Sequence, residues 1–201
     1  MSQQAKFPAA LLWVIILACI MAVGGALVID RANKSRSEIP VLWKVPEFQF
    51  IESSGRPFGL EDMKGKINVV DFIFTNCPNI CPVMSAEMSK LYQLYSESPI
   101  VQFVSISVDP ARDSLEALRA YAASWGVDDD RWVFLRGPIE KVVELSEEGF
   151  KLPAGDLPMG HSNRFVLVDP DGMVRSYHDS FDDASLEILK ANIKELAGRM
   201  R

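Results

Sequence analysis

Cysteine, histidine and positive charge are all scarce in this chain of 201 residues. It contains three cysteines and two histidines, and its 27 acidic side chains outnumber its 21 basic ones, for a net charge of −6 at pH 7. A nucleic-acid backbone binds to a concentrated basic surface, which a chain with this charge balance does not supply. We therefore expect no nucleic-acid partner.

Several signatures of common enzymes are also missing. The sequence has no glycine-rich phosphate-binding loop, no serine nucleophile elbow, no internal repeat and no low-complexity tract. Neither phosphate binding by such a loop nor serine-based acyl transfer is indicated. The few sulfur and imidazole side chains are the residues left to examine for function.

A long uncharged segment lies near the N-terminus. Residues 7–29 carry no charge, and a helix of that length crosses a hydrocarbon core of about 30 Å. A cleaved signal peptide has a shorter apolar core and a small-residue cleavage site. The sequence predicts a tail at residues 1–6, a single transmembrane anchor at residues 7–29 and a polar linker at residues 30–46.

Cys19 lies inside this segment and has a second interpretation. Residues 16–19 loosely match a bacterial lipoprotein processing site, at which Cys19 would be lipidated. Leu17 fits that site poorly and the apolar run continues well past Cys19, so we interpret Cys19 as a small residue on a membrane helix. More basic residues follow the segment than precede it, but long domains translocate largely regardless of flank charge, so the residues alone leave the orientation open.

The rest of the chain, residues 47–201, alternates predicted strands and helices. Such alternation implies parallel strand pairing, and a turn at residues 169–172 (Asp-Pro-Asp-Gly) predicts a late antiparallel hairpin. We predict an α/β fold, a thioredoxin-like mixed sheet flanked by helices. The expected strands are residues 47–51, 66–74, 101–108, 132–135, 164–168 and 173–177, and the expected helices are residues 59–66, 82–97, 115–125, 139–145 and 186–196.

Cys77 and Cys81 lie directly after the apolar run at residues 69–74, where a buried strand gives way to a helix. Each is followed by proline, which predicts a tight loop and a helix that begins at Pro82. Cys81 would then be the N-cap, where unpaired amides stabilise a thiolate. The loop is short enough for a disulfide or a shared metal ion. A disulfide that closes so small a loop would stabilise the fold only modestly, so we favour a reactive or metal-binding role for the two sulfurs.

His161 follows a loop rich in glycine and proline, at residues 152–160. With two thiolates it would complete a set of two sulfurs and one nitrogen, which suits copper, whereas zinc would need a fourth donor. Met159 is left open as a further ligand because it neighbours His161. We interpret His178 as a solvated residue, since acidic side chains follow it.

The remaining candidates have simpler structural interpretations. Met84 and Met88 share a helical face and are predicted to lie in the core. Residues 128–130 (Asp-Asp-Asp) are predicted to form a loop between a helix and a strand. Residues 169–172 lack the further ligands of a calcium loop and are better explained as the hairpin turn.

Three motifs together resemble those of a known family. Residues 74–82 resemble the CxxxC signature with flanking prolines of the Sco/SenC proteins, thioredoxin-fold copper chaperones of cytochrome oxidase assembly. Residues 107–113 resemble the family's post-strand motif, and His161 followed by residues 168–172 resembles its distal histidine segment. The similarity runs in matching order over residues 48–196.

The resemblance implies that Cys77, Cys81 and His161 bind copper, as Cu(I) or Cu(II). It implies delivery of copper to the dinuclear site in the copper-bearing subunit of cytochrome c oxidase, or reduction of that site's cysteines. It also implies a single-pass protein of the cytoplasmic membrane with its domain on the periplasmic or extracytoplasmic side. The family commonly has an acidic residue just before the histidine, where this chain has Gly160.

Other functions remain compatible with the same residues. A thiol–disulfide oxidoreductase would use Cys77 and Cys81 to exchange disulfides with a partner and would not transfer metal. A peroxidase-like enzyme shares the fold but needs a peroxide-consuming cysteine, and no arginine is placed by the motif to assist it. A copper or redox sensor would use the same residues to bind a signalling partner.

Overall fold

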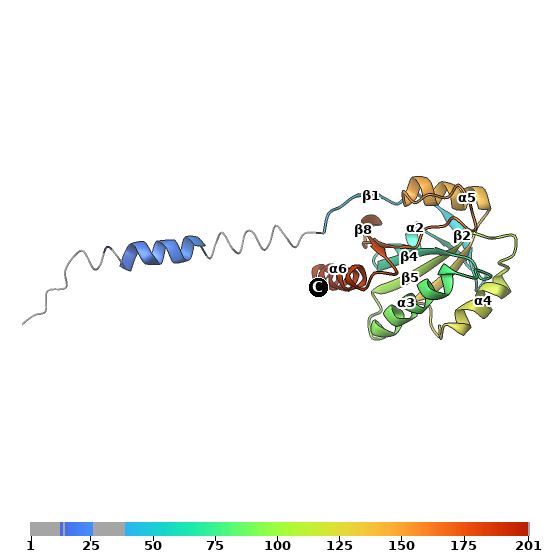
Figure 1. Cartoon of the computed structure of the whole chain (residues 1–201), viewed down its shortest axis with the longest axis horizontal. Coiled ribbons are helices and arrows are strands. Elements are labelled where there is room, and N and C mark those ends of the chain that lie inside the picture. Colours follow the sequence, from blue (N-terminus) through green and yellow to red (C-terminus); the bar gives the residue numbers. More distant parts are fainter. Residues whose placement is uncertain (1–12, 14, 26–38, 201) are drawn as a thin grey trace, which may run out of the picture. The chain divides into compact units, whose positions relative to one another are not determined.

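The computed structural model describes residues 13, 15–25 and 39–200 (Figure 1). The chain divides into two compact units, one ending at Ile39 and the other beginning at Pro40. In the first unit residues 15–25 are helical and exposed. In the described part of the chain, no helix combines the length and the apolarity that crossing a bilayer requires. The rest of the anchor predicted at residues 7–29, and most of the predicted linker, lie outside the described residues.

The second unit is built on one mixed sheet, as predicted. Its strands lie in the order β1-β8-β7-β4-β5-β6-β2-β3. The central pairs β4·β5 and β5·β6 are parallel, and β4·β7, β7·β8, β2·β3, β2·β6 and β1·β8 are antiparallel. The strands are β1 (Trp43–Lys44), β2 (Gln49–Glu52), β3 (Pro57–Gly59), β4 (Ile67–Ile73), β5 (Val101–Ser107), β6 (Trp132–Arg136), β7 (Arg164–Val168) and β8 (Met173–Asp179).

Helices cover both faces of this sheet (Figure 1). On one face the Ser85 hydroxyl of α3 lies 2.8 Å from the Tyr121 hydroxyl of α4, and the hydroxyl of Tyr95, the C-cap of α3, donates to the Lys190 carbonyl of α6 at 3.4 Å. The helices are α2 (Leu60–Met63), α3 (Ile80–Leu94), α4 (Leu115–Ser124), α5 (Ile139–Glu144), its π-helical continuation η1 (Leu145–Gly149) and α6 (Asp183–Arg199).

The core sits against β4, whose residues are all buried. A strand covered on both faces has no polar alternation, which is why this segment forms a continuous apolar run. The Phe72 ring packs edge-on against Phe150, beyond η1, at 5.7 Å between ring centroids. Met84 and Met88 on α3 are fully buried, so their assignment to the core is confirmed.

The hairpin β7–β8 turns as predicted, with Gly172 at a positive φ of 78°. The Asp169 carboxylate accepts hydrogen bonds from the amides of Asp171 and Met173 at 3.0 and 2.9 Å, and forms a buried ion pair with Arg175 at 2.7 Å. Arg175 also donates to the Pro40 carbonyl at 2.9 Å. The turn is therefore cross-linked to the segment that leads into β1.

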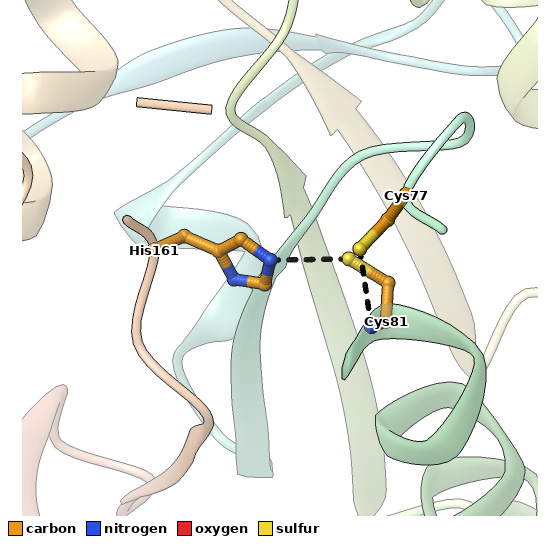
Figure 2. Close-up of side chains that lie close together, drawn as sticks. All are labelled: Cys77, Cys81 and His161. Atoms are coloured by element: carbon orange, nitrogen blue, oxygen red, sulfur yellow. Dashed lines mark hydrogen bonds between the residues drawn. The ribbon is translucent and has the colours of Figure 1, made fainter. Parts of the chain in front are cut away.

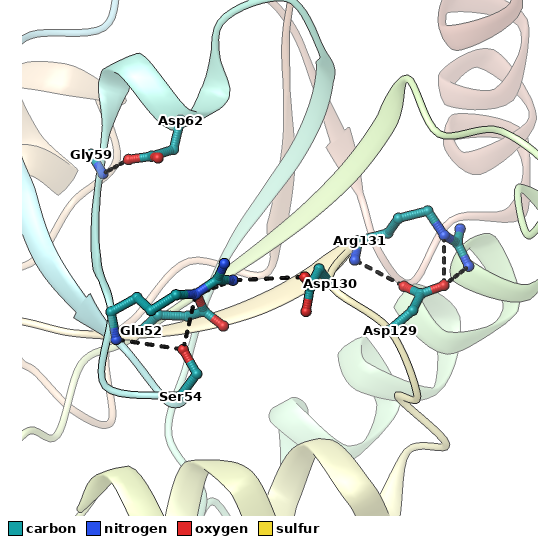
Figure 3. Close-up of polar contacts among 8 residues, drawn as sticks. Glu52, Ser54, Gly59, Asp62, Asp129, Asp130 and Arg131 are labelled. Carbon is teal, nitrogen blue, oxygen red and sulfur yellow. Dashed lines mark hydrogen bonds and ion pairs between the residues drawn. The ribbon is translucent and has the colours of Figure 1, made fainter.

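The acidic run at residues 128–130 is a loop between α4 and β6, as predicted (Figure 3). The Asp129 carboxylate pairs with Arg131 at 2.8 Å. Asp130 lies 4.0 Å from Arg56, which also pairs with Glu52 at 2.8 Å. Asp129 and Asp130 therefore have basic partners, and the Asp128 carboxylate accepts from the Tyr92 hydroxyl at 2.6 Å.

Two short strands were not predicted, and one helix begins earlier than predicted. β1 and β3 are too short to show alternation, and neighbouring strands define them. Helix α3 begins at Ile80, with Asn79 as its N-cap, rather than at Pro82. Proline is tolerated there because amides of the first helical turn have no partner inside the helix.

Candidate metal and dithiol site

The cysteine loop leaves the carboxyl end of β4 and enters α3. The Cys77 amide donates to the Phe74 carbonyl at 3.3 Å, which tightens the turn after the strand. The Cys81 amide, in the first turn of the helix, points at the Cys77 sulfur at 3.4 Å. The sulfur at the helix N-terminus is therefore that of Cys77, and the prediction that Cys81 is the N-cap was wrong.

This arrangement shifts the pKa values of the two thiols in opposite directions. Burial alone would raise the pKa of the Cys77 thiol, but the amides of Cys81, Asn79 and Ile80 direct their hydrogens at its sulfur, and its pKa is lowered overall. Burial raises the pKa of the Cys81 thiol, and the neighbouring Cys77 adds to the rise. Cys77 is thus the more readily ionised of the two thiols.

His161 reaches this site because β7 runs antiparallel to β4, with Val70 opposite Val166. The chain just before β7 therefore lies beside the end of β4. The His161 Nε2 lies 3.1 Å from the Cys81 Sγ (Figure 2). The two sulfurs and the imidazole nitrogen all lie within 4.8 Å of one another, so the three predicted site residues are brought together.

The His161 imidazole is held in an orientation suited to a ligand. Its Nδ1 lies 3.2 Å from the Ser162 carbonyl, which only accepts, so Nδ1 carries the proton and Nε2 faces Cys81 with its lone pair. Burial lowers the pKa of His161, which favours the neutral ring. The Phe74 ring packs edge-on against it at 5.6 Å between centroids.

These three side chains offer two soft sulfur donors and one nitrogen. Such a set suits copper, and among the described residues no further histidine, cysteine or carboxylate joins the cluster to complete a four-ligand zinc site. Both thiols are free. The same pair can therefore act as a metal ligand set or as a redox dithiol.

Gly160 has a steric explanation. A Cβ at this position would lie 2.8 Å from the Cβ of Asp156 and 3.2 Å from its carbonyl oxygen. The Gly160 amide donates to that same carbonyl at 2.7 Å, which closes the turn before His161. The side chain that the resemblance led us to expect here has no room.

The other candidates are placed as follows. Met159 is exposed and Met84 is fully buried. His178 is only 2% exposed, so its assignment as a solvated residue was wrong. Its ring nitrogens bond the Ser176 hydroxyl and the Ser185 carbonyl at 2.8 and 2.9 Å, because β8 turns this side chain towards the start of α6.

One notable residue near the site was missed from the sequence. The Asp71 carboxyl is fully buried in β4, neither of its oxygens has a hydrogen-bond partner among the described residues, and burial raises its pKa to about 7. Asp71 also raises the pKa of Cys81, so it lies close enough to act on that sulfur. A lone acidic residue within the apolar run at residues 69–74 was the available signal.

A thioredoxin-like sheet with a dithiol and an imidazole at the carboxyl end of its central strand defines a dithiol protein able to bind a soft metal. The family model described as SCO1/SenC matches residues 41–198, and the chain belongs to that family. The predicted family resemblance is therefore confirmed.

Three solved structures illustrate the relationship. A SCO1/SenC family lipoprotein from Bacillus anthracis is 36% identical, with a TM-score of 0.70, and the match covers 77% of this chain and 95% of that one. BsSco, a member of the Sco family of cytochrome c oxidase assembly proteins in which a disulfide switch was identified, is 32% identical, with a TM-score of 0.70 and coverage of 80% and 98%. Bradyrhizobium japonicum ScoI, solved with copper bound, is 24% identical over 73% of this chain and 98% of that one, and its TM-score of 0.59 shows a shared fold.

Proposed function

We propose that this protein is a copper chaperone for assembly of the dinuclear copper centre of cytochrome c oxidase. The observation that carries the proposal is the convergence of the Cys77, Cys81 and His161 donor atoms within 4.8 Å. Family membership supports it, since BsSco belongs to a family of oxidase assembly proteins. Copper is the metal this donor set suits, and the proposed partner is the copper-bearing subunit or another copper or thiol protein.

Metal binding in this proposal depends on the redox state of the sulfurs. Only the reduced pair coordinates copper, because ligation requires thiolates and a disulfide has none. The lowered pKa of Cys77 makes its thiolate more accessible than that of Cys81, which must lose its proton as the metal arrives. Copper affinity should therefore fall as the pH is lowered.

The test uses the full chain in detergent, reduced, and titrated with Cu(I) against a colorimetric chelator and separately with Cu(II). We expect one copper per chain, and none in the disulfide form. His161→Ala should weaken Cu(II) binding at least about tenfold and change its absorption spectrum. Cys19→Ala, which removes the cysteine outside the site, is the matched control and should bind like the wild type. Unchanged affinity and spectra in His161→Ala would remove histidine from the site.

A second function is favoured by the unequal thiol pKa values: thiol–disulfide exchange without metal transfer. The Cys77 thiolate would attack a partner disulfide and release one partner thiolate. The Cys81 thiol would then lose its proton to water and displace the second partner thiolate, leaving a Cys77–Cys81 disulfide. Rapid reduction of a disulfide peptide, together with copper affinity no tighter than micromolar, would favour this function over the chaperone.

We also propose the domain organisation that the sequence predicts: a tail at residues 1–6, an anchor at residues 7–29, a linker at residues 30–46 and a domain at residues 47–201. The anchor is supported by the uncharged run itself. The proposed location is the cytoplasmic membrane, with the domain on the extracytoplasmic side.

Resistance of the chain to alkaline extraction from membranes tests the anchor. Intact mass tests lipidation at Cys19, and labelling of Cys77 by a membrane-impermeant thiol reagent on intact cells tests the orientation.

A further inference from the structure

A buried carboxylate ties the start of the cysteine loop to the neighbouring strand. Asp113 is fully buried, and follows β5 in the segment at residues 109–113. Its Oδ1 accepts hydrogen bonds from the Thr75 hydroxyl at 2.6 Å and the Thr75 amide at 3.2 Å. Its Oδ2 accepts from the Ser107 hydroxyl at 2.5 Å. One side chain therefore joins the carboxyl ends of β4 and β5 at the edge of the sheet where the sulfurs lie.

Thr75, which Asp113 holds, lies in the chain between the residue that packs against His161 and the first cysteine of the site. Thr75 follows Phe74, whose ring packs against His161, and precedes Cys77 by two positions. The Cys77 amide donates back to the Phe74 carbonyl at 3.3 Å, so residues 74–77 form one tight turn. A displacement of Thr75 would move the Cys77 sulfur away from the start of α3 and the Phe74 ring away from the imidazole.

The chemistry at position 113 requires an acceptor. All three groups that contact Asp113 donate, and an ionised carboxylate only accepts. An apolar residue would leave the donors of the buried Ser107 and the partly buried Thr75 without this partner, and asparagine would direct its N–H₂ group at a donor. An aspartate at position 113 therefore satisfies the donors of both Thr75 and Ser107.

We propose that Asp113 is a positioning residue of the copper and dithiol site, acting through Thr75 to fix the turn at residues 74–77 that sets Cys77 and flanks His161. This inference rests on the proposed function. It assigns a role to the motif at residues 107–113, which the sequence singled out and which supplies no ligand.

The chain provides a matched control in Asp169. This carboxylate is also buried and also accepts from three donors: the amides of Asp171 and Met173 and the Arg175 guanidinium. It lies at the opposite end of the same sheet, because the preceding residue, Val168, pairs with Asn68 near the start of β4. Asp169→Asn should therefore lower the Tm and leave the site unaltered.

The decisive variant is Thr75→Val, which removes the hydroxyl but keeps the side-chain shape and the Asp113 charge. In the reduced full chain we measure Tm, Cu(I) and Cu(II) affinity, the Cu(II) EPR spectrum and the rate at which the copper-free dithiol reacts with a disulfide reagent. We expect Thr75→Val to weaken copper binding about tenfold, to alter the EPR spectrum and to slow the thiol reaction. Thr75→Ser, which restores the hydroxyl, should return these values towards those of the wild type. Asp113→Asn should match Thr75→Val.

The outcomes separate this inference from the proposed function. If Thr75→Val lowers only the Tm, as Asp169→Asn is expected to, the role of Asp113 is structural and the inference fails. If the wild-type chain binds no copper but Thr75→Val still slows the thiol reaction and Thr75→Ser restores it, the chaperone function fails and the positioning role stands. If Asp113→Asn does not fold, the comparison of Thr75→Val with Thr75→Ser still decides the question.

Discussion

The two histidines lie in different regions of the domain and differ in one contact. His178, on β8, bonds the Ser176 hydroxyl and the Ser185 carbonyl through its two ring nitrogens. His161, in the loop before β7, bonds a carbonyl through one nitrogen and faces the Cys81 sulfur with the other. Both rings are buried, and burial lowers the pKa of each. Burial and the direction of the pKa shift therefore fail to distinguish the proposed ligand, His161, from the structural histidine, His178, whereas the partner of the second ring nitrogen does.

The same comparison explains what each histidine contributes. His178 links β8 to the start of α6, and the Ser185 hydroxyl strengthens that link by accepting from the Asp179 amide at 2.9 Å. All of its polar capacity is used inside the fold. The Nε2 of His161 faces the Cys81 thiol, a weak partner that a metal ion can replace.

Replacing the sulfur that His161 faces should have the largest effect. Cys81→Ser exchanges a soft thiolate for a hard, neutral hydroxyl, and we expect Cu(I) affinity to fall by more than about 100-fold, beyond what losing an outer partner costs. Chelator competition measures the loss, and an unchanged His178 imidazole signal in NMR spectra shows that the other region is undisturbed. Retained affinity would show that Cys81 is not a ligand.

Removing His178 should lower the stability of the fold and leave the copper affinity unchanged. His178→Ala leaves the Ser185 carbonyl without its buried partner, and we expect a loss of about 1–3 kcal/mol in the free energy of unfolding. Copper affinity measured below the unfolding transition should remain that of the wild type. A large loss of copper affinity in the folded variant would contradict the division of roles between the two histidines.

A smaller effect is expected at Gly160. In Gly160→Ala the new methyl would meet the Cβ of Asp156 at 2.8 Å, and the turn must shift, at a cost of about 1 kcal/mol or more. Copper affinity should fall a few-fold because His161 follows directly, while the His178 signal stays in place. Adding Asp156→Gly removes the nearest atom and should restore part of the loss. Failure of the double variant to recover would show that the collision is not the cause.

The smallest effect is the pH dependence. A histidine whose pKa is lowered in the fold stabilises the protein fully above its unfolded pKa of about 6.5, and this stability is lost as the pH falls through the folded pKa. We expect the wild type to lose up to about 1 kcal/mol more than His178→Gln between pH 7 and pH 5, measured by urea unfolding. The raised pKa of Asp71 works in the opposite direction, since the fold holds its proton more tightly, but it is common to both proteins and cancels in the difference. Parallel pH curves would show that His178 does not titrate on unfolding.

Much of the fold could be predicted from local pattern. The apolar run ending at Phe74, the helical spacing of Met84 and Met88 and the turn at residues 169–172 each depend on neighbours in the chain, and each prediction was confirmed. The start of α3 and the burial of His178 were predicted wrongly. The Cys77 sulfur, three residues before the first residue of α3, accepts from an amide of the first helical turn. The His178 ring is buried because β8 lies beside α6, although acidic residues follow it in the sequence.

The sequence by itself determined the alternation of strands and helices, the sulfur pair after a buried strand and the scarcity of other cysteines and histidines, because all three are properties of composition and local order. Only the tertiary structure decided that β7 lies beside β4 and so carries His161 to Cys81 from 80 positions away. It also decided which thiol is more readily ionised, since that depends on the direction of three backbone amides and on burial. Strand order and amide direction arise from packing across the whole sheet, which no short stretch of the chain encodes.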